Sequence, residues 1–453
     1  MLSTGHNSIS TTRRGVAACT HSSVKEILVN LFDKMMQQLD GPQGRFSLLD
    51  RYYSGDQAVT FLNADEAELL NRKLFRMAVN FPRLAVDSLA ERLRVTGLRV
   101  DGAADARLWS DWKANNLDEM AAVAHREALT LGECPVIVWA DDQGNPRVSV
   151  ESPHQCVVRR DPATREVVGA LKRWSNEDAG QTYAVEYLPD QIVWFVAQSA
   201  GAAGGFQAVR KVDNPLGVVP VVDLRNSDRL LGPGASEIDD LIPLVDALDK
   251  LLLDMLTTSE SAARPRRWAT GITLAEDLDS DDPNESSALS NPFPEGDKMM
   301  ISESAESKFG QLPGADLSAY QDAVNVTLQQ IMAMSALPAH MVGITAANPT
   351  SADALRAAES GLTARAEARQ VTFGRAWEQV AALMVAVRTG ADPRAIHTSV
   401  DWAPADTRSA AQEADATVKL FQAGILPRRF ALQKLGYSAE DIAQIEATPA
   451  STN

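Results

Sequence analysis

The chain has 453 residues, a hydrophobic content of 45% and a formal net charge of −17, so it is long and apolar enough for about two to four domains with cores of their own. The acidic excess argues against a protein that coats nucleic acid, because such a protein needs a basic face. It does not exclude a surface past which DNA moves without being held, since an acidic wall repels phosphate at short range.

The three cysteines are odd in number and contain no CxxC pair, which indicates neither a disulfide framework nor a zinc cluster. No apolar run approaches the ~20 residues that cross a bilayer. The stretch from Val16 to Cys19 follows two arginines, but its apolar part is far too short for a signal segment. We therefore expect a protein of a reducing compartment, without a membrane segment.

The N-terminal third is predicted to be helical after a flexible tail. Residues 1–23 are rich in Ser, Thr and Gly without periodicity, which is typical of a flexible terminus. Arg51–Gly55 is expected to form a turn between helices. Helical patterns occupy residues 24–39, 71–93 and 109–131, and the second is interrupted by Pro82 and closed by Gly97.

The composition changes at Gly132, where short β-branched and aromatic runs begin. Turn signals such as Asp142–Pro146 separate the runs, and this spacing favours antiparallel hairpins over βαβ units. No phosphate-binding loop is present, because no GK[ST] sequence leads into a helix. The predicted strands are residues 136–139, 148–150, 156–158, 167–174, 183–188 and 192–196.

A long amphipathic helix is predicted from Ser236, its cap, to about Ala262. Its apolar residues fill one broad arc, and Asp249 falls at the edge of the opposite, charged arc. This arc is either the solvated side of an ordinary helix or, if the helix lines a pore, a wall that repels DNA. Its charged residues are Asp239, Asp240, Asp246, Lys250 and Asp254.

A second helix, Leu317–Ser335, is separated from the first by an insert of roughly fifty residues, a size that is normally functional or disordered. The insert carries an acidic segment at residues 276–295 and a short predicted strand, Met299–Ile301. Its opening cluster consists of Arg264, Arg266, Arg267 and Trp268, which suit either charge-guided docking of a partner or solvated linker charge.

The helix from Leu317 ends before Pro338, and an uncharged loop follows at Gly343–Pro349. The next helix, capped by Thr350 or Ser351, has no proline up to Val387 and could extend roughly 55 Å. It is either a part that reaches beyond its own subunit or a long core helix. After a break at Gly390 come an extended stretch at 401–404 and short helices at 407–422, 428–435 and from 438.

The order of these elements resembles the portal proteins of tailed bacteriophages, in particular those of long-tailed phages. The resemblance covers nearly the whole chain after the tail, and no single stretch is diagnostic. The stretches that carry it are Asn80–Asp87 with Leu93–Gly97, Gly232–Gly234 leading into Glu237–Ile238, Leu337–Gly343 followed by Asn348–Ala352, and Gly424–Pro427.

The resemblance implies an α+β, mainly helical portal fold with long stem and wing helices and a β-rich wing region. The parts it implies are a tail at 1–23, a wing at 24–234, a stem helix at 235–262, a clip at 263–315, a second stem helix at 316–337, a tunnel loop at 338–350, a long wing helix and return at 351–400, and a crown at 401–453.

By the same resemblance, the chain forms a ring of about twelve copies at one capsid vertex and conducts double-stranded DNA during packaging and ejection. The expected partners are the terminase, which spends the ATP, a head–tail adaptor, and the major capsid and scaffolding proteins. We expect a virion protein assembled in the host cytoplasm, with no catalytic residue, cofactor or metal. The DNA-facing loop residues are expected to be Gly343, Ile344, Thr345, Ala346, Ala347 and Asn348, and the channel-lining candidates Asp239, Asp246, Lys250 and Asp254.

Two other classes of protein are weighed against a portal. A different structural ring, such as a head–tail adaptor, would not require the long insert between two helices. An acid–base enzyme would need a pair such as Asp141 with Asp142, or Glu133 with His125. The six histidines are scattered without an HExxH or metal spacing, and a lone histidine on a helix is more often structural.

Overall fold

A computed structural model of the chain shows two compact units. Unit 1 takes the described residues up to 58, from 80 to 245 and from 331 onwards, and unit 2 takes those from 59 to 79 and from 246 to 330. Helices and antiparallel sheets both occur, which confirms the predicted α+β, mainly helical class. The structure describes residues 21–58, 79–227, 229–230, 232–263, 267–270, 306–311, 317–343, 352–406, 410–437 and 439–447.

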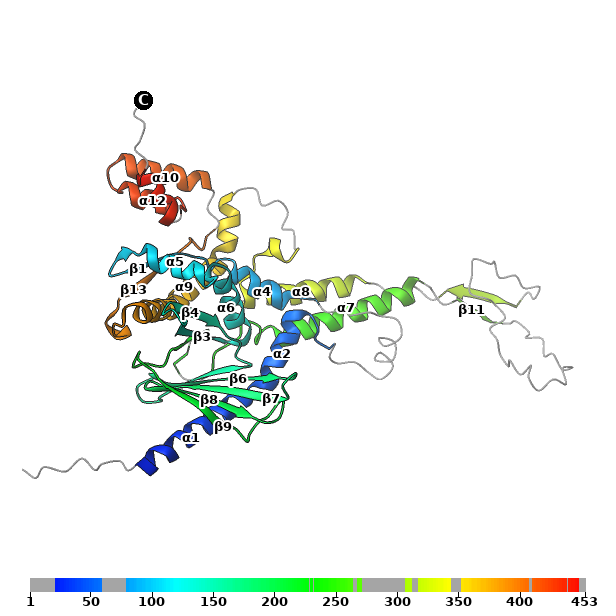
Figure 1. The fold of residues 1–453 in the computed structure, drawn as a ribbon. Coiled ribbons are helices and arrows are strands. Elements are labelled where there is room, and N and C mark those ends of the chain that lie inside the picture. Colours follow the sequence, from blue (N-terminus) through cyan, green and yellow to red (C-terminus); the bar gives the residue numbers. More distant parts are fainter. Residues whose placement is uncertain are drawn as a thin grey trace, which may run out of the picture. The chain divides into compact units, whose positions relative to one another are not determined.

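A five-stranded antiparallel sheet of unit 1 is covered on one face by helix α1 (His21–Asp40) (Figure 1). Phe32, Met35 and Leu39 of α1 are buried against Leu171 and Phe195 of the sheet. All six predicted runs are confirmed as strands, four in this sheet and two, β3 and β4, in the three-stranded sheet described below, whereas β9 was missed because its side chains are mostly exposed. The strands, in spatial order, are β5 (Cys156–Arg160), β6 (Val167–Asn176), β7 (Gln181–Tyr187), β8 (Gln191–Ala197) and β9 (Gln207–Asp213).

Helices α2 (Gln43–Ser54) and α4 (Phe81–Ala90) correct two predictions. Residues 51–54 form the last turn of α2, and only Gly55, at φ 73°, leaves the helix. Pro82 lies in the first turn of α4, where a missing N–H costs nothing, so it begins the helix and does not interrupt one. The part of the predicted 71–93 helix before Val79 lies outside the described residues.

The predicted helix at 109–131 is two helices, α5 (Ala106–Ala114) and α6 (Leu117–Leu131). Asn116 adopts a left-handed conformation at φ 54°, which ends one helix and redirects the chain into the next.

Gly97 does not close a helix but lies in strand β1 (Val95–Val100), opposite Asp401 of β13 (Thr398–Trp402). Strand β2 (Ala103–Ala104) completes this three-stranded sheet. The pairing joins segments about 300 residues apart in sequence, which local patterns do not reveal. It also places the predicted boundary at residue 400 inside a strand.

A second three-stranded sheet has the order β10 (Val221–Arg225), β3 (Glu133–Ala140) and β4 (Pro146–Val150). At its edge the backbones of Gly132 and Gly234 touch, and a Cβ on Gly132 would lie 2.6 Å from the Gly234 carbonyl. Asn226 donates from its backbone to the Gly132 carbonyl over 2.9 Å. The Gly232–Gly234 break therefore serves a close backbone contact.

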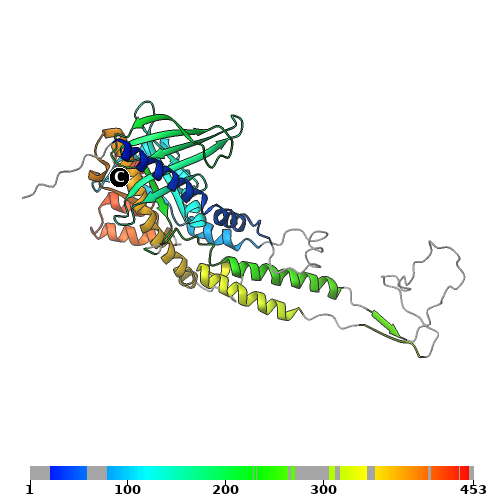
Figure 2. The same ribbon diagram turned by 90° about the horizontal axis from the view of Figure 1, so that it is seen from below.

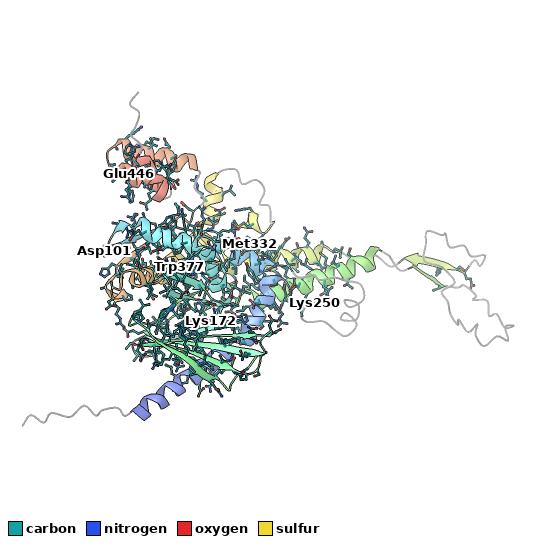
Figure 3. All side chains as sticks on the ribbon, viewed as in Figure 1. Asp101, Lys172, Lys250, Met332, Trp377 and Glu446 are labelled. Atoms are coloured by element: carbon teal, nitrogen blue, oxygen red, sulfur yellow. The ribbon has the colours of Figure 1, made fainter. Side chains whose placement is uncertain are left out.

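Helix α9 (Ala352–Thr389) crosses the core of unit 1 and confirms the predicted long helix. Trp377 and Phe373 are completely buried on it, among Trp112 and His125 (Figure 3). A Cβ on Gly374 would lie 3.2 Å from Trp402 Nε1, so this glycine allows β13 to pack closely.

The connections and the C-terminal helices follow the predicted order. Two short 3-10 helices, η1 (Ala339–Met341) and η2 (Pro393–Ala395), lie in the connections. Helix α9 ends at Gly390, which has φ 71°. The three short C-terminal helices are confirmed as α10 (Ala410–Gln422), α11 (Arg428–Lys434) and α12 (Ala439–Ala447). Within the described ranges, no helix is both long and apolar enough to cross a bilayer.

Unit 2 contains most of two long helices that lie side by side in both ribbon views, α7 (Ile242–Ala263) and α8 (Ser318–Ser335) (Figures 1 and 2). A 3.3 Å hydrogen bond joins the hydroxyls of Thr258 and Tyr320 across the pair. Strands β11 (Arg267–Thr270) and β12 (Lys308–Gln311) form an antiparallel hairpin that sequence patterns did not predict. The predicted strand at 299–301 lies outside the described residues.

Helix α7 begins six residues later than predicted. Pro243 cannot donate to the carbonyl four residues before it, so the helix starts at Ile242, with the proline in its first turn. Residues 237–241 form turns instead, and Ser236 caps that turn, its hydroxyl accepting a 3.0 Å hydrogen bond from the Ile238 N–H.

Candidate functional site

Three of the charged residues predicted for the arc, Asp246, Lys250 and Asp254, lie on helix α7. Lys250 and Asp254 are half-buried and form a 2.6 Å ion pair one helical turn apart (Lys250 is labelled in Figure 3). Asp246 is half-buried on the same helix. The pair neutralises the one lysine among the four channel-lining candidates, so no free cation remains in that set.

Asp239 does not lie on the helix, which corrects its prediction as part of the α7 arc. It lies in the turn before α7, where its carboxylate accepts a 3.1 Å hydrogen bond from the Ser236 N–H and pairs with Arg45 of α2. Its carboxylate therefore joins the turn before α7 to α2 within unit 1.

Asp249 is also not at the solvated edge of the arc. It is only 1% exposed, and its Oδ1 accepts a 2.9 Å hydrogen bond from the Val79 N–H. The carboxylate joins α7 to the chain that leads into α4, a contact that helical periodicity does not contain.

The predicted DNA-facing loop leaves from a turn that the structure describes up to Gly343. Gly343 is exposed and has φ 81°, a conformation that favours glycine. The other five loop residues, Ile344 to Asn348, lie outside the described residues.

The segment before this loop is joined to α9 by a cluster of charged side chains around Glu359. The Glu359 carboxylate of α9 accepts from Arg92 Nη2 over 3.2 Å, and His340 Nε2 lies 3.5 Å from its other oxygen. Arg92 also donates to the carbonyl of Ala405 over 2.8 Å. Glu359 is 8% exposed and Arg92 is also buried, so their contact is made in a low-dielectric setting, whereas the His340 side chain is 38% exposed.

A second cluster lies further along α9. Arg369 Nη2 donates to Glu237 over 2.8 Å, and Arg365 Nη1 lies 3.6 Å from the same carboxylate. Arg365 also donates to the carbonyl of Met334, near the end of α8, over 2.7 Å. Helix α9 thus holds both the turn that precedes α7 and the end of α8.

These five charged residues were missed from sequence. Arg365 and Arg369 are four residues apart on one helix, which shows that they share a face but not what they face. Glu237 and His340 lie in stretches quoted for the portal resemblance, but nothing in the sequence indicated that they contact α9. The missed residues are Arg92, Glu237, Glu359, Arg365 and Arg369.

The partner-docking candidates are only partly described. Arg267 and Trp268 lie in β11, with backbone partners Gln311 and Gly310. Arg264 and Arg266 lie outside the described residues. Their proposed contact role therefore stays a prediction.

The residues weighed for an acid–base enzyme lie in structural surroundings. Burial lowers the pKa of His125 to about 3, opposed by a hydrogen bond with the Leu93 backbone, and its Nε2 accepts from Trp377. Burial and the nearby Asp223 raise the pKa of Glu133 to about 7. Asp141 caps its own turn by accepting from the N–H groups of Gln143 and Asn145 over 2.9 and 2.8 Å.

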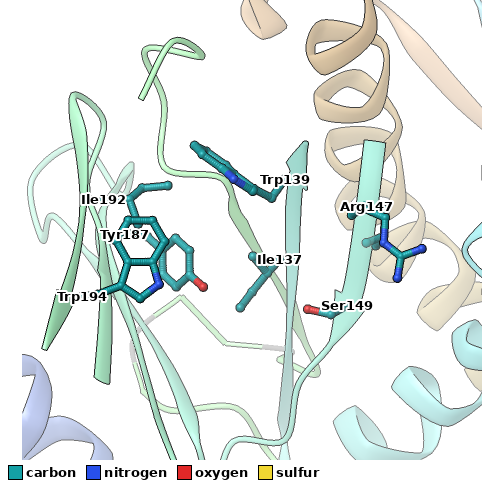
Figure 4. A pocket seen from close by; sticks show the side chains of 8 residues that line it. Ile137, Trp139, Arg147, Ser149, Tyr187, Ile192 and Trp194 are labelled. Atoms are coloured by element: carbon teal, nitrogen blue, oxygen red, sulfur yellow. The ribbon is translucent and has the colours of Figure 1, made fainter. Parts of the chain in front are cut away.

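A cavity of about 210 Å³ lies between the five-stranded sheet and the β10–β3–β4 sheet (Figure 4). Trp139, Tyr187 and Trp194 form its aromatic wall, and the Arg147 side chain points away from it. No charged group is therefore aimed into this space among the residues that line it. In the described part of the chain, no group of three or more His, Cys, Asp or Glu side chains is placed to hold a metal ion.

Comparison with known proteins matches this arrangement to one structural class. The family model "Phage portal protein, SPP1 Gp6-like" matches residues 43–451. The portal protein of Mycobacterium phage L5 is 33% identical over 382 residues, which cover 80% of this chain and 76% of the phage protein. That of Mycobacterium phage D29 is 32% identical over 380 residues, with the same shares.

Solved structures of gene transfer agent particles also align with the chain. The neck of an empty particle gives a TM-score of 0.46 at 14% identity, and the virion of a native particle a TM-score of 0.42 at 14% identity. Both alignments cover 83% of this chain and 94% of the other chain.

The class is that of structural virion proteins at the phage capsid, and the chain belongs to the SPP1 Gp6-like family of phage portal proteins. This confirms the portal resemblance. It also sets aside the head–tail adaptor and the acid–base enzyme, since the family is a structural portal family.

Proposed function

We propose that copies of this chain assemble side by side into a closed ring, of about twelve subunits, whose axial opening conducts double-stranded DNA. Membership of the portal family is the observation that carries the proposal. The ring stands at one capsid vertex, where it serves genome packaging, head–tail joining and DNA ejection.

The α7–α8 pair is the proposed stem, with Asp246, Lys250 and Asp254 as lining candidates. Support comes from the Lys250–Asp254 pair, which leaves the described part of this arc with no net positive charge. Each lysine–phosphate contact adds salt-dependent affinity, so a channel that must release DNA gains from its lysines being paired.

The hairpin β11–β12 and its connections are the proposed clip, the part that meets the terminase and later the head–tail adaptor. A β-hairpin between two long helices supports this role, because it gives the insert a structured surface. Residues 401–453 are the proposed crown. ATP is spent by the terminase, and the ring assembles in the host cytoplasm with the major capsid and scaffolding proteins.

Negative-stain imaging of the purified full-length chain tests the proposal. Rings with a central opening wide enough for a duplex, about 20 Å, are expected. Globular monomers at high protein concentration, or rings without such an opening, contradict it. Imaging at several salt concentrations controls for association driven only by charge screening.

A further inference from the structure

Helix α9 directly contacts the segment that follows α8. Ala336 takes a left-handed conformation at φ 56°, and the next residue, Leu337, is 3% exposed. A Cβ added to Gly361 of α9 would lie 3.5 Å from the Ala336 side chain, which is ordinary van der Waals contact. The segment is thus packed on α9 before any charged contact is considered.

One carboxylate then joins three parts of the chain. Glu359 lies on α9, His340 in the η1 turn, and Arg92 after helix α4. The Arg92 and Glu359 side chains are 9% and 11% exposed, whereas that of His340 is 38% exposed. The Arg92 contact is therefore the stronger of the two, because water screens it least.

We propose that Glu359 is a positioning residue that holds residues 338–343, from which the predicted DNA-facing loop leaves, on helix α9. The role of that loop rests on the proposed function, whereas the contacts of Glu359 are observed independently of it. Neutralising Glu359 leaves Arg92 buried without this charge partner and removes the contact that His340 makes. Residues 338–343 then lose their charged contact with the helix while α9 keeps its apolar core.

Hydrogen–deuterium exchange of the full-length chain tests the positioning. Glu359→Gln is compared with Glu367→Gln, a matched change at an exposed glutamate of the same helix. In Glu359→Gln, amide exchange in peptides of residues 336–343 is expected to rise roughly two- to threefold, because His340 is the residue of this segment that Glu359 contacts, with peptides of 371–387 unchanged. Exchange equal to that of Glu367→Gln, or a rise of the same size across 371–387, overturns the proposal.

His340→Gln keeps the Arg92–Glu359 pair and removes only the more exposed partner. A rise of roughly two- to threefold in the same peptides is expected, since exposed pairs contribute little. If Glu359→Gln does not fold, His340→Gln tests the proposal in its place. The absence of any rise in amide exchange in this variant overturns the proposal.

A second experiment measures the amount of DNA packaged by proheads that carry each variant. At least a tenfold loss is expected with Glu359→Gln and none with Glu367→Gln, although both form rings. Undiminished packaging despite faster exchange overturns the proposed role of the positioned segment in DNA packaging. Failure of the wild-type chain to form rings would instead contradict the proposed function, while the exchange comparison would still judge the positioning.

Discussion

Trp377 donates a 2.8 Å hydrogen bond from Nε1 to Nε2 of His125, and both side chains are completely buried. The bond joins α9 to α6 and requires the imidazole proton to be on Nδ1. The His125 ring also stacks on Phe373, with centroids 5.4 Å apart. A neutral histidine is therefore built into the centre of unit 1.

Acidification should destabilise the protein through His125. Burial lowers its pKa to about 3 from the ordinary value of 6.5, so the unfolded state binds a proton that the folded state excludes. The stabilising effect is complete above pH 6.5 and is lost as the pH falls towards 3, by about 2 kcal/mol at pH 5. Urea unfolding from pH 7 to 5 should show this slope, and His125→Gln should lack it. An identical slope in the variant would contradict the assignment.

Glu186 should have the opposite pH dependence. It is 3% exposed on β7, and burial, then Asp190, raises its pKa to about 7 from 4.5. The folded state holds the proton more tightly, so this contribution is complete below pH 4.5 and is lost as the pH rises through 7, by about 3 kcal/mol in total.

Glu186→Gln keeps the shape and removes the charge. Its free energy of unfolding should exceed that of the wild type at pH 8 and match it near pH 5. Unfolding curves at the two pH values measure the difference. A variant less stable than the wild type at pH 8 would show that the folded state stabilises the ionised carboxylate, which contradicts a raised pKa.

Gly132→Ala should be far more damaging than Gly144→Ala. Both glycines have positive φ, 97° and 82°, but only at Gly132 would the new Cβ meet the backbone of Gly234. We expect a loss of about 1 kcal/mol at Gly144, from backbone strain alone, and more than ~3 kcal/mol at Gly132. Thermal unfolding of the two variants provides the comparison, and equal losses would mean that the close contact is unimportant.

Charge reversal on α7 should make a ring retain DNA. Asp246→Lys with Asp254→Lys adds two cations to the proposed lining and leaves Lys250 without its ion-pair partner. Retention should fall steeply with salt. Glu177→Lys with Asp178→Lys, in an exposed turn of unit 1, makes the same change in net charge and serves as the control. Equal DNA binding by both variants would place the α7 residues away from the channel.

Deletion of residues 344–348 should separate assembly from packaging. Rings should still form, because the described contacts of the preceding segment with α9 involve Met334, Ala336 and His340. Packaging should fall if the loop touches DNA. Imaging and a nuclease-protection assay measure the two properties, and normal packaging would remove the proposed role of the loop.

Local patterns predicted much of this fold correctly. The long helix α9 and the helix α8 follow from apolar spacing, and the β-rich region from β-branched runs between turn signals. The errors occurred where a single residue overrides a pattern. Pro243 delayed the start of α7, and the left-handed Asn116 divided a helix that looked continuous.

The sequence by itself determined the class of the chain, the order of its elements and its portal family, because periodicity, turn residues and motif order are recorded along the chain. Only the tertiary structure decided which charges meet. Arg92 and Glu359 are 267 residues apart, and Asp249 is buried against a backbone N–H 170 residues away. Such pairs depend on how distant segments pack together, and a side chain's type and local spacing do not specify its partner.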